Sequence, residues 1–144
     1  MPVLRSAGII FYRNTPHGRR YLILRSSKHI AERGEYWDFP KGELEDKEKG
    51  IDAAVREAKE EAGIENFELV PEFKHTAQYF SRREGKSIPK FVAMFLAEAS
   101  NDKVTLSWEH DAYEWVSYEE AIKKLTTMKE AIKKANEFLS GKGI

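Results

Sequence analysis

Residues 42–64 read GELEDKEKGIDAAVREAKEEAGI, and this stretch decides what the rest of the chain is expected to form. From Lys49 to Ala62 the pattern is helical, and Gly63 follows where a left-handed C-terminal cap belongs. At about 100° per residue, one side of the helix carries the apolar side chains Ile51, Ala54, Val55, Ala58 and Ala62. Steps of three and four residues return to the same face, so the opposite side carries Glu57, Glu60 and Glu61.

This acidic stripe has two interpretations. Like charges on one helical face repel each other by a few tenths of a kcal/mol per pair, and Arg56, four residues before Glu60, offsets part of this. Runs of charge usually form a solvated face, so periodicity alone favours a surface helix. Hard divalent cations prefer carboxylate oxygens and would reverse the repulsion. Periodicity therefore leaves open a solvated face or a cation site.

The spacing of fixed residue types is a stronger signal than the periodicity. Five residues separate Gly42 from Glu48, seven more precede Arg56-Glu57, and the stretch closes with Glu60-Glu61, Gly63 and Ile64. This is the pattern G-x5-E-x7-R-E-U-x-E-E-x-G-U, with U aliphatic, which a chain of this length matches by chance roughly once in 10⁵ at average residue usage. The pattern is the Nudix box, and the sequence resembles the Nudix hydrolases over nearly its whole length.

This resemblance implies hydrolysis of a nucleoside diphosphate linked to another group, with Mg²⁺ as cofactor and Mn²⁺ as a substitute. It implies that Glu57, Glu60 and Glu61 hold the metal. Glu48 and Arg56 belong to the catalytic set mainly by bracing the loop against the helix. Lys49 departs from the family, because relatives often place a helix-capping Ser or Thr there.

Segments outside the box resemble one group of the family, the asymmetric diadenosine tetraphosphate hydrolases of the animal and archaeal type. Residues 37–43 are similar to its W-x-x-P-K-G segment, residues 107–115 to its S-x-E-H…W stretch, and residues 90–92 to its K-x-V strand. This resemblance implies cleavage of diadenosine tetraphosphate to ATP and AMP. The alternatives are a broader pyrophosphohydrolase, acting on nucleoside triphosphates, RNA 5′ triphosphate ends or diphosphoinositol polyphosphates, and a non-catalytic nucleotide sensor. Such sensors usually lose box glutamates, and all four are present here.

The same resemblance selects residues for contact with the phosphates. Lys41 stands beside the box turn and Lys90 on an expected strand, where each is expected to bind phosphate. Arg25 and Tyr36 are weaker candidates for the phosphate chain. Glu109 is similar to a fourth metal carboxylate carried by a loop, and either it or Glu57 would accept the proton of the attacking water.

Recognition of the base is expected from an aromatic residue about sixteen positions beyond the box, where this chain has Tyr79 and Phe80. The two point to opposite faces if the segment is a strand, so one belongs in the core and the other stacks on adenine. The position of His75, itself expected to be structural, favours Phe80 for stacking. Trp37 is expected to pack in the core or a loop. Residues 126–128 lack an aromatic that relatives often have.

The rest of the chain predicts a mixture of strands and helices. Strands are expected at 5–13, 21–24, 67–70, 74–80, 91–97, 104–106 and 113–116, and helices at 118–125 and 129–139. Residues 14–18 form a turn, 26–35 a loop, 81–90 a hairpin connection and 141–144 a frayed tail. Too few helices remain for βαβ crossovers, which favours one α+β domain with a mixed or mostly antiparallel sheet. The Nudix resemblance refines this to a mixed sheet sandwiched between helices (α/β/α) over residues 1–144.

Composition limits the partners. The 144 residues carry 24 basic and 24 acidic side chains, so bulk charge does not favour a stable nucleic-acid partner or anionic lipid. The chain has no cysteine, which excludes disulfides, thiolate metal sites and a cysteine nucleophile. No apolar run is long enough to span a bilayer, and no export signal precedes the first strand, so a cytoplasmic monomer or dimer is expected.

Overall fold

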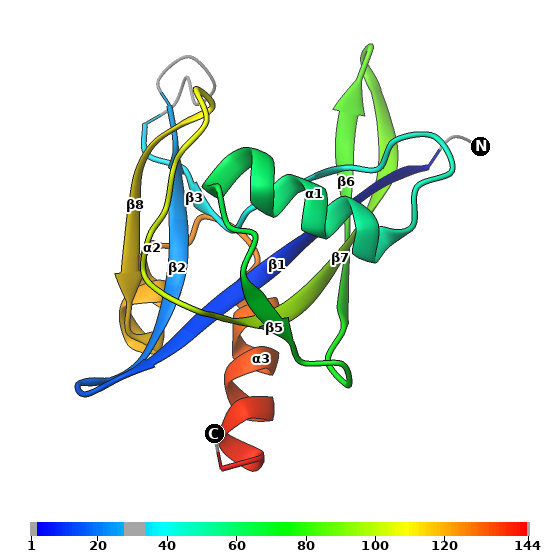
Figure 1. The fold of residues 1–144 in the computed structure, drawn as a ribbon. Helices are drawn as coiled ribbons and strands as arrows, with labels where there is room; N and C mark the ends of the chain where they lie inside the picture. Colours follow the sequence, from blue (N-terminus) through cyan, green and yellow to red (C-terminus); the bar gives the residue numbers. More distant parts are fainter. Residues whose placement is uncertain (1–2, 28–33, 144) are drawn as a thin grey trace.

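The centre of the fold is a pair of long parallel strands that carry the main apolar runs (Figure 1). In the computed structural model, which describes residues 3–27 and 34–143, β1 (Leu4–Thr15) runs parallel to β7 (Lys86–Ala99), from Leu4 opposite Lys90 to Tyr12 opposite Glu98. The other elements are β2 (Gly18–Ser26), β3 (Trp37–Asp38), β4 (Lys41–Glu43), α1 (Gly50–Ala62), β5 (Phe67–Leu69), β6 (His75–Arg83), β8 (His110–Val116), α2 (Tyr118–Lys124) and α3 (Lys129–Gly141). The sheet order is β3-β2-β1-β7-β5, with β8 on β2, β4 on β1 and β6 on β7.

Helices cover both faces of this sheet. Alternate residues of β1 face opposite sides, so Ile9 and Phe11 pack against α1 while Ile10 and Tyr12 face α2 and α3. The contact surface of α1 consists of alanines, which bring the helix close to the strands; these are Ala53, Ala54, Ala58 and Ala62. All described strand pairs except β1 with β7 are antiparallel. The predicted mixed α/β/α arrangement is therefore confirmed.

Two predicted segments differ in the structure. Residues 104–106 lie within the described range and form no strand there, because the Thr105 amide donates to Ala62 O (2.9 Å) at the end of α1 instead of joining the sheet. The expected connection at 81–90 is mostly strand. β6 and β7 continue to a two-residue turn at Glu84 (φ 52°) and Gly85 (φ 76°), whose positive φ values suit a tight hairpin.

The helix itself also corrects the sequence prediction in detail. It buries Ala53 rather than Val55, which is 38% exposed. The acidic stripe is not a solvated face along its whole length, because Glu61 is buried. Lys49 is the N-cap residue and, among the residues described, makes no side-chain cap hydrogen bond, as its departure from Ser or Thr predicts. None of the helices in the described part of the chain is long and apolar enough to cross a membrane.

Candidate active site

Short strand β4 brings the loop before α1 against the acidic side of the helix. β4 pairs with β1, with Gly42 opposite Ala7, and this register presses Gly42 against Glu57. A Cβ atom at position 42 would lie 2.5 Å from both carboxylate oxygens of Glu57, so any larger residue there would displace this carboxylate. At the far end of α1, Gly63 (φ 65°) donates its amide to Lys59 O and ends the helix as predicted.

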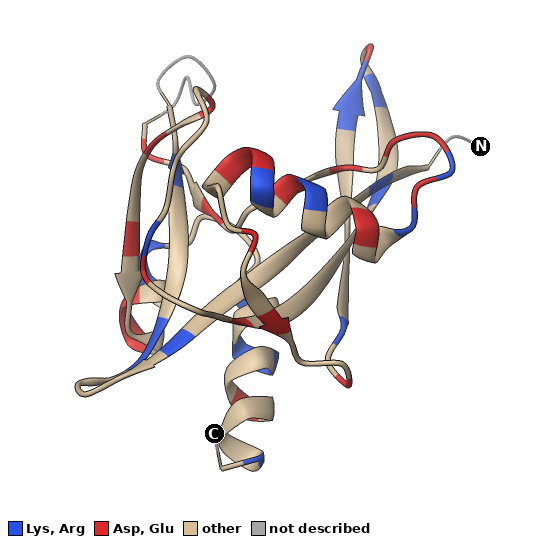
Figure 2. Cartoon of the chain, in the orientation of Figure 1, with Lys and Arg blue, Asp and Glu red and all other residues tan. Residues whose placement is uncertain are grey.

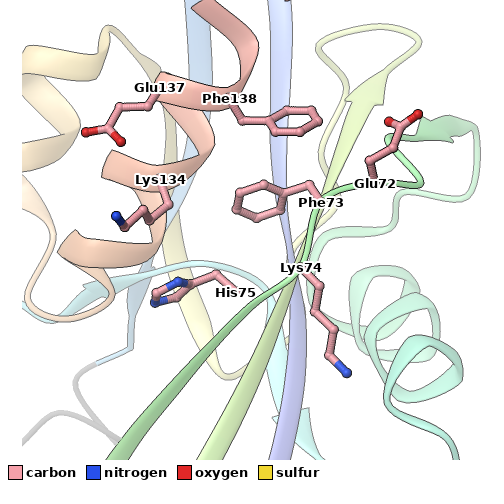
Figure 3. A pocket seen from close by; sticks show the side chains of 7 residues that line it. All are labelled: Glu72, Phe73, Lys74, His75, Lys134, Glu137 and Phe138. Carbon is pink, nitrogen blue, oxygen red and sulfur yellow. The ribbon is translucent and has the colours of Figure 1, made fainter. Parts of the chain in front are cut away.

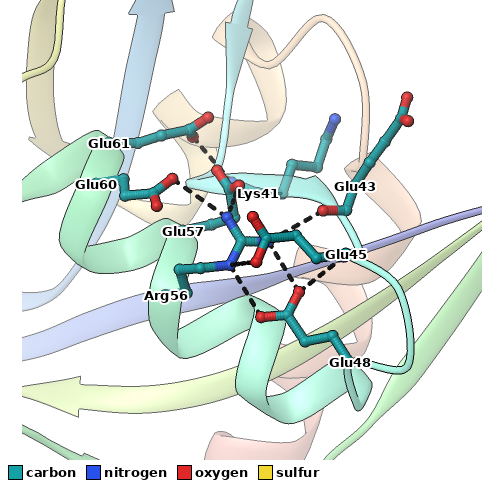
Figure 4. A network of polar contacts seen from close by, with 8 residues as sticks. All are labelled: Lys41, Glu43, Glu45, Glu48, Arg56, Glu57, Glu60 and Glu61. Carbon is teal, nitrogen blue, oxygen red and sulfur yellow. Dashed lines mark hydrogen bonds and ion pairs between the residues drawn. The ribbon is translucent and has the colours of Figure 1, made fainter.

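Arg56 is the hub of the polar network around this loop (Figure 4). Its guanidinium binds Glu48 through two parallel hydrogen bonds, Nε to Oε2 and Nη2 to Oε1, both 2.9 Å. Nη1 reaches Glu57 Oε1 at 2.8 Å and Glu60 Oε2 at 3.2 Å, and Nη2 donates to Glu43 O at 3.1 Å. The hydrogen bonds from Arg56 lower the pKa of Glu48 to about 2. Arg56 and Glu48 thus join the loop to the helix.

Burial and mutual repulsion distinguish Glu61 and Glu57 from a solvated charge run. Glu61 Oε1 accepts a hydrogen bond from the Lys41 amide at 3.0 Å, and Glu61 as a whole is only 6% exposed. Burial, together with the charges of Glu57 and Glu109, raises the pKa of Glu61 to about 9. Burial also raises the pKa of Glu57. Crowded, desolvated carboxylates of this kind are typical of functional sites.

The acidic set fits a hard divalent cation in its chemistry. Its donors are carboxylate oxygens, and a bound cation would relieve the repulsion that raises the pKa of Glu61. Glu57 and Glu61 are shielded within the box, Glu109 is half-buried on its loop and Glu60 is exposed at the rim. Within residues 3–27 and 34–143, no three acidic or imidazole groups already form a cation cage. The guanidinium of Arg56 contacts both Glu57 and Glu60 instead.

Lys41 is held by a buried carboxylate that the sequence analysis did not select. Lys41 Nζ lies 2.9 Å from Asp38 Oδ2, and Asp38 Oδ1 accepts the Phe39 amide at 2.7 Å. Burial opposes the charged form of Lys41, but the Asp38 carboxylate outweighs it and raises the pKa of the lysine. The available signal was the acidic residue between Trp37 and Phe39, three positions before Lys41, since a charge among aromatic residues needs a partner when it is buried.

Lys90 and Tyr79 lie beside Lys41. Lys90 is opposite Tyr79 in the β6–β7 ladder, and its Nζ lies 5.9 Å from the centre of the Tyr79 ring. Burial, followed by the charge of Lys41, lowers the pKa of Lys90. The pKa of Tyr36 is raised by burial and by the Asp38 charge, with Lys41 and Tyr79 also close enough to act on it. Two lysines and two tyrosines therefore share one site next to β4.

Other predicted residues lie away from this group. Phe80 is 65% exposed on the strand face opposite to Tyr79. Arg25 is occupied by Asp111, at 2.7 Å, and by Glu35, at 3.4 Å. Trp37 is buried, as expected for a packing residue, and donates its indole N–H to Glu35 at 3.2 Å.

A hollow of about 440 Å³ lies between α3 and the start of β6 (Figure 3). It is lined by Glu72, Phe73, Lys74, His75, Lys134, Glu137 and Phe138. The rings of Phe73 and Phe138 pack edge-to-face with centres 5.7 Å apart. His75 therefore lines a hollow that contains none of the box glutamates, consistent with a structural histidine.

Charge is distributed unevenly around the helix (Figure 2). Acidic residues, with basic ones between them, recur along the loop before α1 and on the helix, while basic residues flank the acidic turn at the tip of the β6–β7 arm. Arg83, on this arm, forms an ion pair with Glu43, whose Oε2 also lies 4.0 Å from Lys90 Nζ. Acidic and basic side chains thus meet beside β4.

A Nudix-type hydrolase site is defined by this box, braced by Arg56 on an α/β/α fold. A family model described as NUDIX domain matches residues 2–137, and the chain belongs to this family. A relative from Caenorhabditis elegans, named bis(5'-nucleosyl)-tetraphosphatase [asymmetrical], is 34% identical over 143 residues, covering 96% of this chain and 99% of the relative. A relative of the same name from Mus musculus is 32% identical over 148 residues, covering 94% and 95%.

The fold is similar to solved structures as well. The crystal structure of a C. elegans Ap4A hydrolase binary complex superposes with a TM-score of 0.82 and 34% identity, covering 96% of this chain and 98% of that one. Nudix hydrolases use divalent metal cations, which is consistent with the oxygen donors of the box. The chain is therefore a Nudix hydrolase.

Proposed function

We propose that this protein is a Mg²⁺-dependent hydrolase that cleaves diadenosine tetraphosphate asymmetrically into ATP and AMP. The observation that carries the proposal is the position of Lys41: its amide donates to Glu61, while its side chain lies beside Lys90, Tyr36 and Tyr79. Lys41 thereby connects the acidic site to a site of lysines and tyrosines. A polyphosphate with a terminal base needs both, because its phosphates would bind the cation and the lysines while its base would stack on an aromatic ring. The names and the full-length coverage of the relatives support the same substrate.

Glu57, Glu60, Glu61 and Glu109 would hold the cation, for which Mn²⁺ would substitute. When bound there, Mg²⁺ neutralises phosphate charge and lowers the pKa of a coordinated water. Arg56 and Glu48 keep the Glu57 carboxylate in place. Lys41 and Lys90 supply fixed positive charge for the phosphate oxygens. Glu57 or Glu109 accepts the proton of the attacking water.

For the base, Tyr79 is the better candidate than Phe80. Its ring lies next to Lys90, so a base stacked on it would be continuous with the phosphate-binding lysines. Phe80 projects from the opposite face of β6. Tyr36, near both Tyr79 and Lys41, would border the same position.

Product analysis tests the proposal directly. The protein is incubated with diadenosine tetraphosphate and Mg²⁺ in ¹⁸O-labelled water. The products are separated by chromatography, and their masses are determined by mass spectrometry. ATP with ¹⁸O-labelled AMP is expected, and chelation of the metal should abolish the reaction. Two molecules of ADP would refute asymmetric cleavage. Turnover of nucleoside triphosphates or triphosphorylated RNA in its place would assign the protein to the broader pyrophosphohydrolases.

A pair of variants separates phosphate binding from folding. Lys90→Met keeps the length of the side chain and removes its charge, so KM should rise while the melting temperature stays close to that of the wild type. Lys86→Met provides the matched control, because Lys86 is exposed near the turn of the same hairpin. Equal KM values for the two variants would remove Lys90 from the site.

A further inference from the structure

Next to Glu109 in the sequence lies a large, exposed aromatic residue, Trp108. Trp108 is 72% exposed, more than any other large apolar residue among those described. It lies directly before Glu109, whose charge acts on the buried Glu61. Core packing does not account for a tryptophan at this position, and an exposed aromatic ring at the rim of a site suits recognition of a flat ligand.

The backbone around Trp108 is rigidly attached to the site. Residues 107–110 form a turn in which the His110 amide donates to Ser107 O at 3.2 Å and the Glu109 amide to Ser107 Oγ at 3.3 Å. The Ser107 amide donates to Glu61 O on α1 at 3.4 Å, and the Ser27 amide donates to Glu109 O at 2.8 Å. The turn is therefore bonded to α1 on one side and to the end of β2 on the other. The backbone that carries the ring therefore loses little conformational freedom when a ligand binds.

The turn and the Tyr79 site lie toward different ends of α1. In Figure 1 the start of β8 lies at the left of α1, toward its C-terminal end, while the β6–β7 arm that carries Tyr79 and Lys90 rises above its right-hand end. Glu61 is bonded to a segment on each side, because its carboxylate accepts the Lys41 amide at 3.0 Å and its backbone carbonyl accepts the Ser107 amide at 3.4 Å. A polyphosphate that passes the glutamates from the lysines would therefore leave the site near residues 107–110.

We propose that Trp108 stacks on the second nucleobase of a dinucleoside polyphosphate, at the end opposite to the base held by Tyr79. This inference rests on the proposed function and adds the residue that distinguishes a substrate with two bases from one with a single base. Stacking on an aromatic side chain needs only the flat face of the base, so it suits an exposed ring without hydrogen-bonding partners. Trp108 is a specificity residue in this scheme and takes no part in the chemical step.

The test compares diadenosine tetraphosphate with adenosine 5′-tetraphosphate, which has the same phosphate chain and one base. Trp108→Ala should raise KM for the two-base substrate at least about fivefold, leave kcat nearly unchanged, and leave KM for the one-base substrate unchanged. Trp108→Phe keeps an aromatic ring, so its KM for the two-base substrate should stay close to that of the wild type. Leu69→Ala, which also removes an exposed apolar side chain, serves as the control and should alter neither KM.

A second readout does not depend on turnover. Equilibrium binding of the two nucleotides to the protein in the presence of Ca²⁺ should show a preference for the two-base ligand, and Trp108→Ala should abolish this preference. Unchanged KM values and affinities in Trp108→Ala would overturn the inference, and so would an equal loss for both nucleotides. If the protein cleaves diadenosine tetraphosphate and Trp108→Ala changes neither KM nor affinity, the proposed function holds and the role of Trp108 is refuted. A wild-type protein that neither cleaves nor prefers the two-base ligand would overturn both.

Discussion

Replacement of Gly42 by alanine tests whether the position of the Glu57 carboxylate controls catalysis. The added methyl would lie 2.3 Å from Glu57 Cδ and 2.5 Å from both carboxylate oxygens, whereas ordinary contact begins at 3.4 Å. The carboxylate must therefore move by about 1 Å, and a displacement of about 1 Å at a reacting site can cost about 10²-fold in rate. Because Arg56 Nη1 holds Glu57 Oε1 at 2.8 Å, the same movement strains the network that braces the loop.

The fold should tolerate this change better than the reaction does. Gly42 is not among the glycines with positive φ, so alanine can adopt its backbone conformation, and the atoms that it meets belong to the end of a side chain. We expect kcat on diadenosine tetraphosphate to fall about 100-fold while the melting temperature changes by only a few degrees. Steady-state kinetics and thermal unfolding of the same preparation measure both quantities.

Two other glycines provide the controls for this experiment. At Gly50, the first residue of α1, a Cβ would lie 3.9 Å from the Phe95 ring, so alanine should stabilise the helix by about 0.5–1 kcal/mol and leave kcat unchanged. At Gly8, a Cβ would collide with the backbone oxygen of Pro40, so alanine should lower stability together with activity. Activity of Gly42→Ala within threefold of the wild type would refute the reasoning, because the Glu57 carboxylate would then tolerate displacement.

Three further outcomes follow from the same contacts. Glu60→Gln should lower turnover by orders of magnitude and leave the melting temperature unchanged or raised, because it removes a charge that repels Glu57, while the ion pair of Glu60 with Arg56 is exposed and contributes little; substantial residual activity would exclude Glu60 from the metal set. In chelator, the free energy of unfolding should fall as pH rises between about 5 and 9, because folding raises the pKa of Glu61 to about 9 and the stability gained from its neutral form is lost as the group ionises. When the free energy of unfolding of Glu61→Gln is measured by urea unfolding at several pH values, it should depend less steeply on pH than that of the wild type. An unchanged pH dependence would show that Glu61 is not the group responsible. Ile132→Ala should cost about 2–5 kcal/mol in the same assay, since Ile132 is fully buried in the core beneath α3; a cost near zero would contradict this packing.

The box and the helix that carries it were predictable because their determinants are local. Glycine, glutamate and arginine at set spacings define which side chains share a helical face, and Gly63 marks where the helix ends. The same local rules failed at Val55, because propensity and periodicity give the angle of a face only approximately. The local rules also failed at residues 104–106. The pattern predicts a strand there, but the Thr105 amide donates to the carbonyl of Ala62 at the end of α1, so the segment does not pair with the sheet.

The sequence by itself determined the family, the acidic box and the residues that brace it. Tertiary structure alone decided which groups meet that box from elsewhere in the chain. The pairing of β6 with β7 places Tyr79 beside Lys90 and sends Phe80 to the other face, since neighbouring side chains of a strand point in opposite directions. The fold buries Asp38 against Lys41 and presents Trp108 beside Glu109. Burial and proximity across the sheet depend on the positions of all the elements together, and no local spacing encodes them.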